Sequence, residues 1–122
     1  MAALGATIAA TLAAIDAANA DDPRRIDGRA FETIYAERMS AVLGEIYPDA
    51  SDLLKIAARA QHLRRWEILR ANYPEGRRGY NDWRRACREH HARVAGTLMR
   101  DAGYDAAAID HVGALLRKEQ LK

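Results

Sequence analysis

The fold of this chain is decided by a helical pattern, which is clearest in the segment SDLLKIAARAQHLRR at residues 51–65. The apolar residues of this segment form one stripe at helical spacing, made of Leu53, Ile56, Ala57, Ala60 and Leu63. Ser51 directly precedes the pattern, and its hydroxyl is expected to cap the first turn. The segment therefore predicts an amphipathic helix over residues 52–65.

Outward from this helix, helical periodicity continues along almost the whole chain, and strand-like alternation of β-branched residues is nearly absent. Further helices are predicted over residues 7–19, 30–46 and 80–102, and a last one begins after Asp105, its expected N-cap. Residues 1–122 are therefore expected to form a single domain of the all-α class, a bundle of about five helices.

The predicted helices carry large apolar residues on one side. The helix over residues 30–46 is expected to bury Phe31, Ile34, Tyr35, Met39, Val42 and Ile46. Its polar side would hold Glu37 as a solvated or ion-paired carboxylate. Gly103 follows the helix over 80–102 as a suitable C′ residue. The expected apolar face of that helix consists of Trp83, Cys87, His91, Val94 and Leu98.

Two segments between the helices are rich in turn-forming residues. Residues 20–28 are expected to form a linker, because they contain Pro23, Gly28 and adjacent aspartates. Residues 66–79 lose the helical periodicity, and one proline and two glycines there argue against a long regular helix. A connection of this length in a small domain is more often functional than decorative.

Positive charge is concentrated in residues 57–93. This window holds ten of the sixteen arginines but only four acidic residues, a local balance of +6 in a chain whose net charge is +2. Such segregation predicts a surface that attracts anions. Arginine also holds phosphate or carboxylate through two parallel hydrogen bonds. A GC-rich genome would explain the general preference for arginine over lysine, but it would not explain the clustering.

The candidate anion-binding residues in this window are Arg64, Arg65, Arg77, Arg78 and Arg84. Aromatic residues are expected to line the same pocket, namely Tyr35, Trp66, Tyr80 and Trp83. An alternative that the sequence leaves open is a solvated face, on which these arginines form salt bridges with acidic residues.

His62 and His91 are the candidate catalytic residues, as proton carriers, and also the candidate ligands of a divalent metal ion. His62 lies off the main apolar stripe of its helix, so it faces a cavity if that helix is central and solvent if the helix is peripheral. The spacing alone favours the solvent-facing position. His91 lies within an apolar face, one turn after Cys87. A core histidine with a satisfied hydrogen bond is favoured there over a metal pair. The cofactor is thus a divalent metal or none.

Composition narrows the cellular setting. The single cysteine, Cys87, excludes an internal disulfide and favours a reducing compartment. Residues 1–20 are apolar but lack the basic n-region of a signal peptide. No segment approaches the roughly 20 strongly apolar residues that a transmembrane helix needs. The chain is therefore expected to be cytoplasmic and to have no membrane partner.

Five motifs resemble those of an uncharacterised bacterial and fungal family, in the right order and over nearly the whole chain. They are YAERM at residues 35–39, AARAQHLRRW at 57–66, YPEGRRGYNDWR at 73–84, His-Ala at 91–92 and LLRKEQLK at 115–122. Members of that family continue with an acidic helix. The resemblance therefore implies a truncated or naturally short form, a homodimer, or a second polypeptide that completes the site.

A more distant resemblance is to the HD-domain phosphohydrolases, all-helical metal-dependent enzymes that act on nucleotides and other phosphate esters. It places Tyr35 where those enzymes have their first ligand histidine, and it aligns His62 and Leu63 with their His-Asp pair. Neither Tyr35 nor Leu63 matches the ligand at its position, so the usual metal site is not intact. The resemblance implies an HD-like arrangement of helices with a degenerate metal site.

These observations lead to three functional hypotheses. In the first, an HD-related domain binds or hydrolyses a phosphorylated small molecule or nucleotide in an arginine-rich pocket. In the second, the basic aromatic face over residues 59–93 makes a non-catalytic module that binds nucleic acid or protein. In the third, the chain is a structural helical subunit whose charge asymmetry serves assembly.

Overall fold

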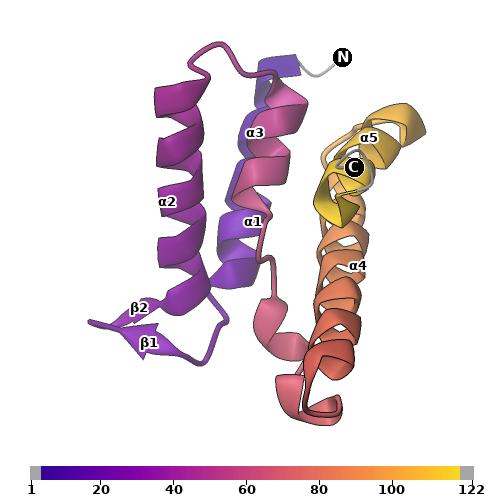
Figure 1. The fold of residues 1–122 in the computed structure, drawn as a ribbon. Helices are drawn as coiled ribbons and strands as arrows, with labels where there is room; N and C mark the ends of the chain where they lie inside the picture. Colours follow the sequence, from indigo (N-terminus) through magenta and orange to yellow (C-terminus); the bar gives the residue numbers. More distant parts are fainter. Residues whose placement is uncertain (1–3, 119–122) are drawn as a thin grey trace.

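The computed structural model describes residues 4–118 and consists almost entirely of helices (Figure 1). The elements in chain order are α1 (Leu4–Asn19), β1 (Arg25–Ile26), β2 (Arg29–Ala30), α2 (Phe31–Ile46), α3 (Asp52–Arg59), the 3-10 helices η1 (Arg65–Glu67) and η2 (Arg70–Asn72), α4 (Arg77–Asp101) and α5 (Ala106–Arg117). The predicted all-α class is confirmed. The last part of the LLRKEQLK motif, residues 119–122, lies outside the described residues.

Helices α1, α2 and α3 lie side by side in one half of the molecule, and α4 and α5 pack together in the other (Figure 1). The halves meet where α3 contacts α5 and where α1 contacts α4. The largest apolar side chains of their shared core are Ile15, Ile56, Leu63, Met99, Val112 and Leu116. Burial of this apolar surface is the main favourable term that holds the two halves together. None of the helices within residues 4–118 combines the length and the apolar character needed to cross a membrane.

Helix α3 begins as predicted but ends early. Ser51 Oγ accepts the backbone N–H of Leu54 at 3.2 Å, which confirms the N-cap. The helix ends at Arg59 rather than Arg65, and Arg64 adopts a left-handed conformation with φ of 54°. The backbone N–H of Arg64 donates to Asn19 Oδ1 of α1 at 3.1 Å. This contact holds the left-handed turn at Arg64. The α-helical pattern has ended before it, because the N–H of Gln61 donates only three residues back, to Ala58.

Helix α2 has the predicted bounds to within one residue, but the prediction of its buried face is wrong. Phe31, Val42 and Ile46 are exposed, whereas Glu32 and Ala36 are buried. The inner face is thus rotated by about one residue, or roughly 100°, from the predicted one. The reason is that α2 carries apolar side chains on two faces, and its inner face uses a small residue and a hydrogen-bonded carboxylate.

The predicted linker over residues 20–28 is wrong in its second part, where β1 and β2 form a short antiparallel hairpin. The two residues between the strands, Asp27 and Gly28, have positive φ angles of 52° and 80°. An Asp-Gly pair between short strands is a strong hairpin signal, because both positions of a type I′ turn require positive φ. The hairpin could therefore have been predicted from this dipeptide.

Helix α4 begins at Arg77, before the predicted start, and continues through Gly79. A Cβ atom at Gly79 would lie 1.8 Å from the carbonyl oxygen of Pro74. This glycine therefore allows a close approach of two backbone segments and does not break the helix. The C-terminal end is as predicted, because Gly103 has φ of 102° and Asp105 Oδ1 accepts an N–H in the first turn of α5 at 2.9 Å.

Candidate functional site

The site begins with a carboxylate that holds the start of α2. Asp22 is fully buried, and its Oδ2 accepts the backbone N–H of Glu32 at 3.0 Å. This bond satisfies a free N–H group in the first turn of α2, where the N-cap residue Ala30 has no side-chain acceptor. Arg24 Nε donates to Asp22 Oδ1 at 3.0 Å. Burial raises the pKa of Asp22, but these hydrogen bonds outweigh burial and leave the pKa below its ordinary value.

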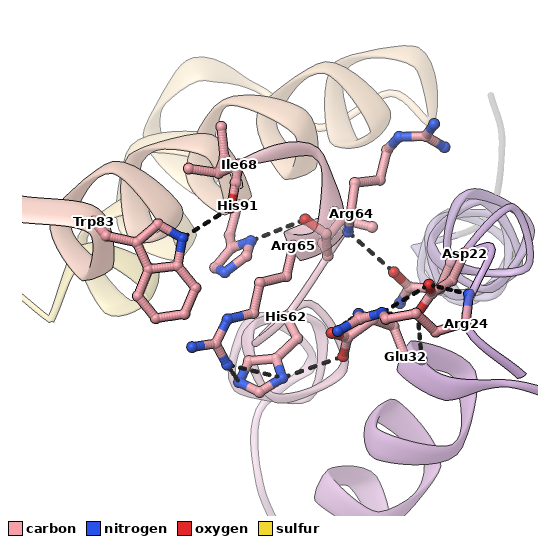
Figure 2. Close-up of polar contacts among 11 residues, drawn as sticks. Asp22, Arg24, Glu32, His62, Arg64, Arg65, Ile68, Trp83 and His91 are labelled. Carbon is pink, nitrogen blue, oxygen red and sulfur yellow. Dashed lines mark hydrogen bonds and ion pairs between the residues drawn. The ribbon is translucent and has the colours of Figure 1, made fainter. Parts of the chain in front are cut away.

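The same arginine fixes Glu32, whose side chain is 1% exposed. Arg24 Nη2 donates to Glu32 Oε2 at 2.7 Å, and Glu32 Oε1 accepts from His62 Nδ1 at 3.1 Å. Figure 2 shows this series of contacts, which runs from Asp22 through Arg24 and Glu32 to the histidine. A buried carboxylate is stable only with such partners. Glu32 in turn holds the imidazole of His62 in one orientation.

His62 is held from three sides. Besides the contact with Glu32, its Nε2 accepts from Arg65 Nη1 at 2.8 Å. Its ring stacks on Tyr35, with centroids 3.6 Å apart and planes 3° apart. Because arginine only donates, the lone pair lies on Nε2 and the proton on Nδ1. The spacing in the sequence favoured a solvent-facing position for His62, and this was wrong, because the structure places His62 in the wall of a cavity.

His91 of α4 is 3% exposed, and its Nδ1 donates to the carbonyl oxygen of Leu63 at 2.8 Å. Burial lowers the pKa of His91 to about 3, so the ring is neutral and Nε2 carries a lone pair. Nε2 has no hydrogen-bond partner among residues 4–118. His91 and His62 lie near each other in Figure 2, and their ring centroids are 6.2 Å apart. The favoured interpretation of His91 as a hydrogen-bonded core histidine is confirmed.

Both histidines line one pocket of about 160 Å³, which we call the cationic pocket. It lies between α2, the segment that follows α3, α4 and the end of α5. Four of its lining residues are basic: Arg65, Arg84, Arg88 and Lys118. The described lining contains no aspartate or glutamate. The pocket is therefore strongly electropositive.

Among the residues that the structure describes, no carboxylate neutralises the charges of the cationic pocket. None of its four cations forms an ion pair within residues 4–118, whereas arginines elsewhere, such as Arg59, pair with acidic residues. Lys118 Nζ donates to Gln61 Oε1 at 3.3 Å. Burial lowers the pKa of Lys118, and the positive charges of Arg88 and Arg84 lower it further. A bound anion would relieve this repulsion.

Cys87 also lines the cationic pocket, one helical turn before His91. Burial raises the pKa of its thiol, although the neighbouring Arg65 and Arg84 act in the opposite direction. The thiol is therefore protonated at neutral pH and is a weak nucleophile. Cys87 therefore lines the pocket but has no evident chemical role in it.

The structure brings only part of the predicted anion-binding set to the pocket. Arg65 and Arg84 line it together with Tyr35 and the two histidines. Arg77 and Arg78 lie instead on the exposed surface at the first turn of α4. Arg64 forms ion pairs with Asp21 and Glu67, so its guanidinium stabilises the fold.

The predicted aromatic residues other than Tyr35 stand outside the pocket. The Trp66 ring centroid lies 5.1 Å from the Arg64 guanidinium, and Tyr80 is 43% exposed. Trp83 acts indirectly, because the Arg65 guanidinium lies 4.7 Å from its ring centroid. The indole Nε1 of Trp83 donates to the carbonyl oxygen of Ile68 at 2.8 Å, which fixes the ring. Trp83 therefore lies outside the pocket and helps to fix the position of the Arg65 guanidinium.

Several site residues were missed by the sequence prediction. Arg88 lies one helical turn after Arg84, so its position on the same face of α4 was detectable. Lys118 belongs to the LLRKEQLK motif, but the motif gave it no role. Glu32 and Gln61 gave no sequence signal, because a carboxylate and an amide on helices are most often solvated.

The residues that the structure describes around His62 and His91 do not fit a divalent metal ion. Both ring nitrogens of His62 are engaged, and the one that carries a lone pair faces the guanidinium of Arg65. Nε2 of His91 would supply one ligand, where a metal site needs several. Within residues 4–118, no three histidine, cysteine or acidic side chains gather closely enough to hold a metal ion.

A larger cavity of about 320 Å³ lies between α1, α2 and α3, but it is a weaker candidate. Its arginine, Arg59, already donates to both carboxylate oxygens of Asp16 and to the hydroxyl of Ser40. Its described lining contains no histidine. The chemical groups that interact with small charged ligands are concentrated in the cationic pocket.

Comparison with known proteins places the chain in a family but gives it no activity. Neither the curated proteins nor the solved structures include a match to this chain. Residues 9–122 match the family described as a domain of unknown function, DUF4202. The match includes every element that forms the cationic pocket. The chain belongs to the DUF4202 family.

Proposed function

We propose that this chain binds a small phosphorylated molecule in the cationic pocket. The observation that carries the proposal is the convergence of Arg65, Arg84, Arg88 and Lys118 on one cavity without a carboxylate in its described lining. Cations that repel one another at short range are stabilised by an anion with more than one charge. A phosphate group meets this requirement, and guanidinium groups bind it through paired hydrogen bonds.

The size of the cationic pocket favours a small ligand. Its volume of about 160 Å³ lies below the roughly 300–1,000 Å³ of pockets that enclose drug-sized molecules. The pocket therefore suits a short phosphate ester, or the phosphorylated end of a larger molecule such as a nucleotide.

Arg65 is oriented before any ligand arrives. Its Nη1 donates to His62, and its guanidinium lies on the ring of Trp83. Such contacts reduce the conformational entropy that an arginine loses when it binds a ligand. The guanidinium also contacts the Cys87 thiol, and its remaining N–H groups are available to an anion. The series from Glu32 through His62 to Arg65 thus supports an anion-binding role.

Hydrolysis of a bound phosphate ester is an extension of this proposal, suggested by the distant resemblance to HD-domain phosphohydrolases. A carboxylate that fixes the imidazole, as Glu32 fixes His62, is an arrangement that a general base needs. However, Nε2 of His62, which would accept the proton, faces Arg65. Hydrolysis therefore requires Arg65 to turn from His62 to the phosphate, which would free Nε2 to accept a proton from water. With a pKa of about 3, His91 is too weak a base to take that role at neutral pH.

Titration calorimetry with inorganic phosphate tests the binding proposal. Arg88→Ala should lower the affinity about tenfold or more, because a hydrogen bond to a charged group contributes roughly 1.5–3 kcal/mol. The matched control is Arg78→Ala, which removes the same charge from an exposed position of the same helix. The control should change the affinity by less than about twofold, because a distant exposed charge is screened. Equal losses in the two variants would contradict a specific pocket.

A second candidate function is binding of nucleic acid by the exposed surface of α4. Arg77 and Arg78 are exposed there, and Tyr80 lies nearby with 43% of its surface accessible for stacking on a base. This function predicts RNA or DNA binding that weakens steeply as salt increases. Binding that does not change between low and moderate salt, or that survives Arg77→Ala with Arg78→Ala, would rule out this surface.

A further inference from the structure

The cationic pocket contains one atom that a phosphate group does not explain, the Nε2 of His91. The proton of the neutral imidazole is fixed on Nδ1, because Nδ1 donates to the Leu63 carbonyl at 2.8 Å. Nε2 is therefore only an acceptor. Nε2 has no hydrogen-bond partner among residues 4–118, and within the pocket it is open to solvent, because it is not one of the described side-chain atoms that are both buried and unpaired. A ligand that fills the pocket displaces solvent from this acceptor, so the ligand must supply a donor of its own if the acceptor is to stay paired.

The fully ionised phosphate group of an ester does not supply that donor, because it carries no P–OH group. Its oxygens accept hydrogen bonds, so an oxygen placed against Nε2 would bring two lone pairs together. A hydroxyl group does supply a donor, and its own oxygen remains free to accept from a neighbouring cation. The hydroxyl must lie close to the phosphate, because both fit within about 160 Å³ and Arg65 shares the pocket wall with His91.

We infer that the ligand is a phosphorylated polyol. Its phosphate contacts the four cations of the pocket, and a hydroxyl group on a nearby carbon donates to Nε2 of His91. This inference rests on the proposed function and deepens it, because it makes His91 a specificity-determining residue. A phosphate ester of the same length without hydroxyl groups leaves Nε2 unpaired, and the site discriminates against it for that reason.

Two ligands of equal charge and chain length test the inference. Titration calorimetry should give a dissociation constant for glycerol 3-phosphate that is lower than that for n-propyl phosphate by about tenfold or more. Equal dissociation constants for the two esters would overturn the inference and leave the proposed phosphate site intact. Failure of both esters and of inorganic phosphate to bind would contradict the proposed function, and the inference with it.

A variant and a spectroscopic signal locate the preference at His91. In His91→Phe, which removes the acceptor, the two esters should bind with similar affinity. The wild-type protein gives a second measure that does not depend on folding of the variant: the ¹⁵N resonance of His91 Nε2 should shift with glycerol 3-phosphate and remain in place with n-propyl phosphate. A preference for glycerol 3-phosphate without that shift would assign the selection to another residue and overturn the role of His91.

Discussion

At the scale of single residues, the site depends on charges that the fold has taken out of water. Glu32 is buried on the inner face of α2, where Arg24 and His62 occupy its two carboxylate oxygens. Asp22, fully buried, accepts the backbone N–H of Glu32. Removing one partner from such a cluster leaves other polar groups buried and unpaired, and this costs more than the loss of an exposed ion pair.

Glu32→Ala should therefore lower the free energy of unfolding by about 2–3 kcal/mol, the size expected for hydrogen bonds to a buried charged group. Glu37→Ala is the matched control on the same helix, since Glu37 pairs with Arg29 at the surface. The control should lower stability by no more than about 1 kcal/mol. Urea denaturation at pH 7 measures both, and equal effects would show that Glu32 is not a structural centre of the site.

The buried histidine predicts a pH dependence of stability. The pKa of His91 is about 3 in the folded protein, below its ordinary value of 6.5, so the unfolded chain binds a proton that the folded chain excludes. Stability from this group is complete above pH 6.5 and falls as the pH drops toward 3, by up to about 1.4 kcal/mol per pH unit. Urea denaturation between pH 7 and 5 should show this loss.

The contribution of His91 is isolated by a difference between variants. His91→Phe should flatten the slope between pH 7 and 5, whereas His111→Gln, at an exposed position of α5, should retain the wild-type slope. The account of His91 as a buried neutral group would be wrong if the slope were the same in all three proteins.

At the scale of elements, the sequence predicts helices well where local signals are strong. The caps at Ser51 and Asp105 and the glycine at 103 mark helix ends that the structure confirms. The end of α3 at Arg59 was not predictable, because the apolar spacing continues past it to Leu63. The turn that follows is held by a hydrogen bond from Arg64 to Asn19, 45 residues earlier in the chain. The predicted orientation of α2 was wrong for a similar reason, because periodicity does not tell which of two apolar faces packs against the rest of the protein.

Alanine substitutions at two helical glycines are expected to have opposite effects on the stability of the protein. Gly79→Ala should destabilise the protein by more than about 2 kcal/mol, because its Cβ would lie 1.8 Å from the Pro74 carbonyl oxygen. Gly44→Ala should stabilise it by roughly 0.5–1 kcal/mol, because this helical position has no atom within 4 Å of the new Cβ. Thermal unfolding monitored by circular dichroism checks both signs, and a stable Gly79→Ala variant would contradict the packing at the start of α4.

At the scale of the whole molecule, the candidate site was only partly visible in the sequence. The arginine-rich window contained Arg65, Arg84 and Arg88, but composition alone did not separate these from arginines that pair with acids or face solvent. The fold makes that separation for Arg65 and Arg88, which are partly buried where α4, the turn after α3 and Lys118 surround one cavity. Arg84 lines the same cavity from an exposed position on α4. The partnership of His62 with Glu32 joins residues 30 positions apart, and no local spacing encodes it.

The arrangement of the histidines also predicts the metal content of the purified protein. Elemental analysis of protein prepared without chelators or metal-affinity steps should find far less than one divalent metal ion per chain, because Arg65 occupies the lone pair of His62. Metal in a ratio near one, lost in both His62→Ala and His91→Ala, would contradict this account and restore the predicted metal site.

The most direct test of the central claim is to locate the bound phosphate by NMR. Titration of ¹⁵N-labelled protein with inorganic phosphate should shift the side-chain signals of Arg65, Arg84 and Arg88 together, with one dissociation constant, and leave those of the exposed Arg77 and Arg78 nearly unchanged. Shifts confined to Arg77 and Arg78, or spread evenly over all arginines, would contradict the assignment of the cationic pocket as an anion-binding site.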